Sequence, residues 1–112
     1  MNRQAAFDKA LSSILKQGKL CFVDGPQRKA RYNANGNKCS VGYLIDNYNP
    51  SIEGFSVCQL KRDGILQTLF NESISDADFL FLVDVQLAHD VSDSVDQFAS
   101  QMKTISLRRK LK

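Results

Sequence analysis

The sequence has no long apolar stretch. A membrane-spanning helix needs about 18 consecutive apolar residues, and no such run exists. Charged residues at Asp8, Lys9 and Lys16 interrupt the N-terminal segment, which therefore lacks the unbroken apolar core of a secretory signal. We expect a cytoplasmic protein with no membrane partner.

Residues that build disulfide and metal sites are also scarce. The three cysteines, Cys21, Cys39 and Cys58, are odd in number and widely spaced, which is not a disulfide framework. The sequence has one histidine, His89, and no Cys-x-x-Cys pair, so the paired ligands of a zinc site are missing. The calcium-loop pattern is missing too. We expect no metal and no cofactor.

Basic residues are absent from a long acidic stretch. Residues 63–102 hold eight acids and no Lys or Arg, a block of −8. Residues 1–62 carry +6 and residues 103–112 carry +5, which leaves a net charge of +3. With 43% hydrophobic and 24% charged residues, the 112-residue chain is typical of a single globular domain over residues 1–112.

Apolar residues at helical spacing predict an amphipathic helix over residues 3–17. Asn2 can cap its start, and Gly18 can end it in the left-handed conformation. Residues 20–33 predict a small β-hairpin, with strands at Leu20–Val23 and Arg31–Tyr32.

Turn residues connect and follow this hairpin. Asp24–Pro26 is a turn signal between its strands. Residues 33–38 have loop composition, in which Asn35–Gly36 suits positive φ. Residues 39–45 could form a strand or a short helix, and we favour a helix turn that begins near residues 38–40.

The second half of the chain predicts three more helices. Ser56 can cap a helix that runs to about Phe70, although Gly64 weakens its middle. Residues 76–90 are apolar on every side and predict a buried central helix, with a buried strand at residues 79–85 as the alternative.

The last helix begins near Ser92 or Ser94, and acids in its first turn and bases in its last complement the helix dipole. The predicted fold is therefore α+β: a mostly helical small single domain of four to five helices with a short β-hairpin.

Cys39 and His89 are the candidates for enzymatic chemistry. A cysteine at a helix N-terminus has a lowered pKa and is a better nucleophile, and His89 would be its base. Asp84 or Asp90 would orient the imidazole. The alternative is that Cys39 is a small buried apolar residue.

Basic clusters suggest nucleic-acid binding as another candidate function. They lie in the hairpin region and the C-terminal tail: Arg28, Lys29, Arg31, Lys38, Arg108, Arg109, Lys110 and Lys112. No recognised nucleic-acid motif accompanies them, and the acidic block would repel a duplex. We therefore expect no direct nucleic-acid partner.

The acidic block suggests a surface for a cationic protein, because complementary charge speeds encounter and fixes orientation. Internal pairing with the chain's own basic residues is the alternative.

Two motifs occur in the chain, one over residues 36–54 and one over residues 85–90. The first reads Gly-x-x-Cys-Ser-Val-Gly-x-Leu-Ile and continues to Tyr-x-Pro-x-x-Glu-Gly, and the second is Val-Gln-x-x-His-Asp. They resemble motifs of a family of small, largely uncharacterised bacterial and phage-borne proteins, which have Ala at Ser40 and Leu at Val85. The matched residues are Gly36, Cys39, Val41, Gly42, Leu44, Ile45, Tyr48, Pro50, Glu53, Gly54, Gln86, His89 and Asp90. The resemblance implies a shared fold and no particular activity.

Small cytoplasmic proteins of competitive loci often include immunity proteins of contact-dependent growth inhibition systems, which is an analogy at the level of class. We predict a non-enzymatic immunity protein that neutralises a cationic, nuclease-type toxin by occluding its active site. The alternatives are a nucleic-acid-associated accessory protein of a phage or mobile element, and a cysteine-dependent enzyme. The partner-binding residues expected are Glu72, Asp76, Asp78, Asp84, Asp90, Asp93 and Asp96.

Overall fold

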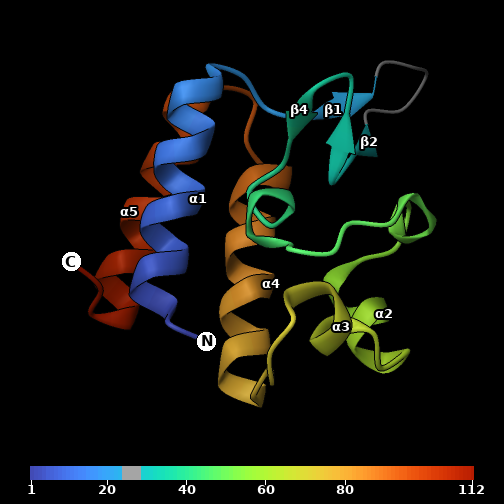
Figure 1. The fold of residues 1–112 in the computed structure, drawn as a ribbon. Helices are drawn as coiled ribbons and strands as arrows, with labels where there is room; N and C mark the ends of the chain where they lie inside the picture. The colour runs from blue at the N-terminus through green and yellow to red at the C-terminus, as the bar shows by residue number, and fades with distance from the viewer. Residues whose placement is uncertain (24–28) are drawn as a thin grey trace.

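Three long helices and a smaller layer of short elements form the protein (Figure 1). The computed structural model describes residues 1–23 and 29–112. The predicted α+β class, mostly helical with a short hairpin, is confirmed. The described residues form five α-helices: α1 (Arg3–Gln17), α2 (Val57–Arg62), α3 (Leu66–Phe70), α4 (Asp76–Asp90) and α5 (Val95–Arg109).

The predicted hairpin forms with a shifted second strand. β1 (Phe22–Val23) pairs antiparallel with β2 (Lys29–Ala30), with Phe22 opposite Ala30. The return strand does not lie at Arg31–Tyr32 as predicted, because the Tyr32 N–H donates to Glu53 Oε1 at 2.9 Å instead of to β1. The predicted turn at Asp24–Pro26 lies outside the described residues.

A second hairpin follows where the sequence indicated only a loop. β3 (Asn33–Ala34) pairs with β4 (Asn37–Lys38). The turn residues Asn35 and Gly36 have φ of 54° and 82°, as their sequence suggested, and two successive positive φ values match the twist of a tight hairpin. These strands are too short for hydrophobic alternation to reveal them.

A 3₁₀ turn, η1 (Gly42–Leu44), takes the place of the helix turn predicted to begin near residues 38–40. A Cβ on Gly42 would lie 2.1 Å from the Tyr32 carbonyl oxygen, so only glycine allows this approach. A second 3₁₀ turn, η2 (Pro50–Ile52), follows.

The single helix predicted from Ser56 to Phe70 is wrong, because the chain forms two short helices there. Ser56 caps α2 through a capping box with Gln59. Gly64, between α2 and α3, has a φ of 74°, which breaks the helical path rather than only weakening it.

The remaining helix predictions are confirmed. Asn2 caps α1, and Gly18 ends it at a φ of 79°. Ser94 caps α5, so of the two predicted starts the second is correct.

Helix α4 lies at the centre, as predicted, and packs against α1, α2 and α5 (Figure 1). Its burial is one-sided, however. Phe81, Leu82 and Val85 are buried, whereas Leu80 and Leu87 are each 55% exposed. The prediction of burial all round is therefore wrong, because Leu80 and Leu87 on its outer side remain exposed.

No helix in the described part of the chain has the length and apolar character needed to cross a membrane.

Candidate functional site

Residues from the two sequence motifs meet in a continuous polar chain. The Cys39 thiol donates to Gln86 Oε1 at 3.2 Å, and Gln86 Nε2 donates to Asp90 Oδ1 at 2.8 Å. The same carboxylate oxygen lies 3.0 Å from His89 Nδ1. Gln86, His89 and Asp90 are close because positions three and four apart share one side of α4.

The hydrogen bonds of His89 define its protonation. The Cys21 backbone N–H can only donate, and it lies 2.9 Å from Nε2. Nε2 is therefore the acceptor, and Nδ1 carries the proton that is donated to Asp90. The ring is completely buried and stacks on Phe22 with centroids 4.8 Å apart. A neutral imidazole thus connects the β1 segment to α4.

Cys39 is not placed as a reactive nucleophile. Its side chain is completely buried, and burial raises the pKa of the thiol far above its usual value of 9.0. The Gly42 N–H donates to Sγ at 3.3 Å, which only partly opposes this rise. Cys39 also reaches His89 through Gln86 and Asp90 rather than directly. The contacts on the thiol are those of a structural cysteine.

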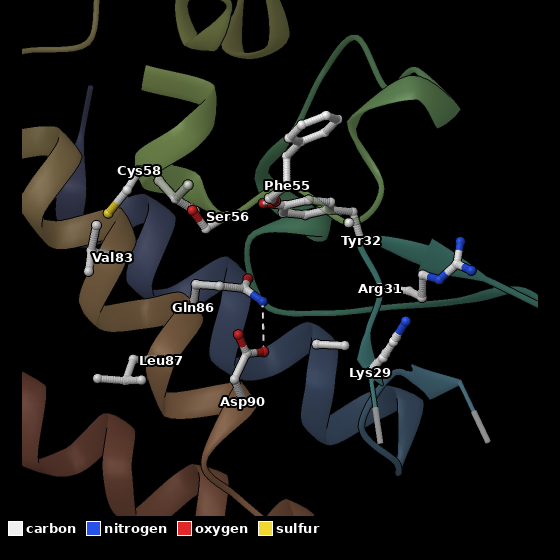
Figure 2. A pocket seen from close by; sticks show the side chains of 13 residues that line it. Lys29, Arg31, Tyr32, Phe55, Ser56, Cys58, Val83, Gln86, Leu87 and Asp90 are labelled. Atoms are coloured by element: carbon white, nitrogen blue, oxygen red, sulfur yellow. Dashed lines mark hydrogen bonds between the residues drawn. The ribbon is translucent and has the colours of Figure 1, made fainter. Parts of the chain in front are cut away.

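A groove of about 450 Å³ opens above this polar chain (Figure 2). One wall is α4, a second is the start of α2 with the residues before it, and a third is the segment from β2 to Tyr32. The lining residues are Lys29, Ala30, Arg31, Tyr32, Gly54, Phe55, Ser56, Val57, Cys58, Val83, Gln86, Leu87 and Asp90.

The two sides of the groove carry opposite charges. Lys29 and Arg31 form no ion pair with any residue in the described ranges, 1–23 and 29–112. On the α4 wall, Asp90 Oδ1 is occupied by Gln86 and His89, but Oδ2 has no hydrogen bond within those same ranges. Figure 2 shows Asp90 and Gln86 on one side and Lys29 on the other.

No family model, curated protein or solved structure matches the chain.

The acidic block does not form one free surface. Among residues 1–23 and 29–112, four of its carboxylates form ion pairs, and two of these, Glu72 and Asp78, pair with the N-terminal amino group. The pairs are Glu72 with Met1 (3.0 Å), Asp76 with Lys61 (3.3 Å), Asp78 with Arg3 (2.9 Å) and Asp84 with Arg109 (2.8 Å). The alternative of internal pairing thus holds for these four acids.

Asp78 is the most enclosed of these acids, with 4% of the residue exposed. Burial raises the pKa of its carboxyl, but hydrogen bonds from Arg3 and from Ser75 outweigh burial and hold that pKa below its usual 3.8. Its carboxylate caps α4 and pairs with α1, which leaves little of it for a partner.

The other candidate acids lie in different places. Asp76 has 91% of its side chain exposed, and such an exposed ion pair adds little stability. Asp90 lines the groove. Asp93 and Asp96 lie together beside a hollow at the start of α5. The seven predicted residues are therefore spread over α4, the segments on either side of it and the first turn of α5.

The basic clusters are also divided. Arg108 and Arg109 both contact Asp84, so part of the charge of the tail is used inside the molecule. Arg28 lies outside the described residues. Lys29 and Arg31 lie at the groove rather than beside the tail.

No group of three His, Cys, Asp or Glu side chains in the part of the chain that the structure describes could hold a metal ion.

Sequence reasoning missed the exposed apolar residues at the groove and along the outer side of α4. Phe55 is 44% exposed, and Leu80, Leu87 and Val91 are 50–55% exposed. Part of this could be predicted from the sequence. Leu80, Leu87 and Val91 are separated by seven and four residues, and this spacing places them along one side of a helix, opposite the side formed by Phe81, Leu82 and Val85. Only the structure shows which side packs inward.

Proposed function

We propose that this chain is a non-enzymatic binding protein, of the immunity-protein type, that binds a cationic nuclease-type toxin through the outer face of α4. We use "outer face" for Leu80, Leu87 and Val91 together with the flanking carboxylates Asp76, Asp84 and Asp90. The proposal places the complex in the cytoplasm, where it would block the active site of the toxin.

The exposed apolar ridge is the observation that carries this proposal. Leu80, Leu87 and Val91 are 55%, 55% and 50% exposed. Steps of seven and four residues bring them to one side of a helix with 3.6 residues per turn. Exposed apolar residues gathered on one side of a helix mark a site where proteins interact, whereas scattered single residues do not.

Charge supports a cationic partner. Helix α4 carries four aspartates and no Lys or Arg. Asp76 and Asp84 each lie four residues from Leu80, and Asp90 lies three residues after Leu87, so these carboxylates border the ridge. Asp84 remains paired with Arg109, which reduces its contribution. An apolar centre with an acidic border suits a partner with apolar and basic residues around its active site.

A binding measurement with a toxin encoded beside the gene tests the proposal. We expect Leu87→Lys to weaken the complex at least tenfold, because it removes an apolar contact and adds a repelling charge. Leu107→Lys is the matched control, since Leu107 is 72% exposed on α5 and lies outside the proposed surface. It should change affinity by less than threefold.

Calorimetry at two salt concentrations completes the test. Affinity should fall as salt rises, because acidic side chains contribute to binding. Equal losses from both substitutions would contradict the proposed surface. Failure of the wild-type chain to bind the toxin, or binding of RNA or DNA at low salt in its place, would contradict the proposed function.

A further inference from the structure

We infer that the groove above the polar chain is a binding site for a small zwitterionic ligand with an apolar body, of the size of a dipeptide. This site overlaps the proposed toxin surface at Leu87 and Asp90, but it binds a different class of ligand and can be tested without the toxin.

Size and shape fit such a ligand. The groove volume of about 450 Å³ lies within the range of roughly 300–1,000 Å³ that is usual for small-molecule sites. Val83, Leu87 and Phe55 supply apolar walls, and a few polar groups lie among them. An apolar site with a small number of placed polar groups is typical of pockets that orient a ligand.

The charges select a zwitterion over a simple anion or cation. Asp90 Oδ2 is an open acceptor for a ligand ammonium group. On the facing wall, Lys29 and Arg31 have no acidic partner among residues 1–23 and 29–112. Lys29 lies between Asp90 and the outward-pointing Arg31 (Figure 2), so Lys29 would bind a ligand carboxylate and Arg31 would add positive charge behind it. A ligand with only one of these charges would leave the other wall unmatched.

Buried groups hold Asp90 in place, which distinguishes it from a surface aspartate that water surrounds. Its Oδ1 accepts from His89, whose ring is completely buried, and from Gln86. The Cys39 thiol, also completely buried, fixes the other end of the Gln86 amide. A binding group that is oriented by supporting hydrogen bonds loses less freedom when a ligand arrives.

Cys58 offers a direct report of occupancy. It lines the groove and is exposed, whereas Cys21 and Cys39 are buried. A ligand in the groove should slow the alkylation of Cys58 by iodoacetamide. The two buried thiols serve as internal controls, because their labelling would reveal unfolding.

The experiment compares three probes on the wild-type chain by calorimetry and by Cys58 alkylation. They are the dipeptide Leu-Leu, its N-acetyl form without the ammonium group, and its C-terminal amide without the carboxylate. We expect Leu-Leu to bind and to protect Cys58, and each blocked form to bind about tenfold more weakly, which corresponds to 1.4 kcal/mol.

Two variants then assign the charges. Asp90→Asn should weaken Leu-Leu about tenfold and leave the N-acetyl form unchanged. The double variant Lys29→Ala/Arg31→Ala should weaken Leu-Leu and leave the amide unchanged. Asp96→Asn, which removes an exposed acid outside the groove, is the control and should bind as the wild type does.

Three results would overturn the inference. One is no binding of Leu-Leu at millimolar concentration. Another is equal binding of all three probes, which would show a purely apolar groove. The third is protection of Cys58 by inorganic phosphate that Asp90→Asn does not change, which would show an anion site. None of these measurements requires the toxin, so this inference and the proposed function fail separately.

Discussion

Replacing His89 with phenylalanine tests the buried hydrogen bonds that support the groove. Phenylalanine keeps a ring of similar size against Phe22 but removes both ring nitrogens. The buried Cys21 N–H would then lose its acceptor, which now lies at 2.9 Å. An unsatisfied buried donor costs about 1–3 kcal/mol. Asp90 would also lose a donor, but its half-exposed carboxylate can turn to water.

We expect the free energy of unfolding to fall by about 2 kcal/mol. At about 2.1 cal/mol/K per residue, the unfolding entropy of 112 residues is about 0.24 kcal/mol/K, so Tm should fall by about 8 °C. Thermal and urea unfolding, followed by circular dichroism, measure both quantities.

Leu80→Phe is the control, since it places the same new ring on an exposed position of the same helix. It should change stability by less than about 0.5 kcal/mol. If the free energy of unfolding of His89→Phe lies within about 0.5 kcal/mol of the wild-type value, the imidazole does not satisfy the Cys21 amide. His89 would then not hold Asp90 in place.

Three further predictions concern packing, access and pH. Gly42→Ala should destabilise the protein by about 3 kcal/mol in urea unfolding, because the new Cβ would overlap the Tyr32 carbonyl; unchanged stability would mean that the two segments are not in contact. Under native conditions, Ellman's reagent should modify one thiol quickly, that of Cys58, and all three thiols only in denaturant; rapid modification of more than one would refute the burial of the others. Hydrogen bonds from Arg3 and Ser75 lower the pKa of Asp78 in the folded protein. The ionised carboxylate therefore stabilises the fold above pH 3.8, the pKa of the unfolded chain, and this stabilisation is lost as the pH falls through the lower pKa of the folded state. Asp78→Asn should thus be less stable than the wild type at pH 7, and the difference should shrink in unfolding curves recorded below pH 4; a constant difference across this range would contradict the ion pair.

The long helices were predictable because their signals are local. Helix α1 has an apolar stripe between a capping asparagine at residue 2 and Gly18, and all of these signals lie within one segment. The same holds for the start of α5 at Ser94. Such features depend on neighbours a few residues away, so the sequence is sufficient to place them.

The groove depends on contacts between distant residues. Cys39 and Gln86 are 47 positions apart, and Cys21 and His89 are 68 apart. The sequence singled out Cys39 and His89 as candidates, but it did not show that Gln86 and Asp90 would separate the thiol from the imidazole. The pairing of Asp78 with Arg3 was equally invisible, because both residues also suit an exposed surface.

Glu53 has a further consequence for how this protein behaves in concentrated solution. Its carboxylate accepts the backbone N–H groups of Tyr32 and Asn33, at 2.9 Å and 3.1 Å, just beyond β2. Unpaired N–H groups beside a short strand attract strands of other molecules and begin aggregation. Here an acidic side chain occupies both donors and places a negative charge on them. Molecules of this protein therefore cannot join edge to edge at this point of the hairpin without first displacing Glu53.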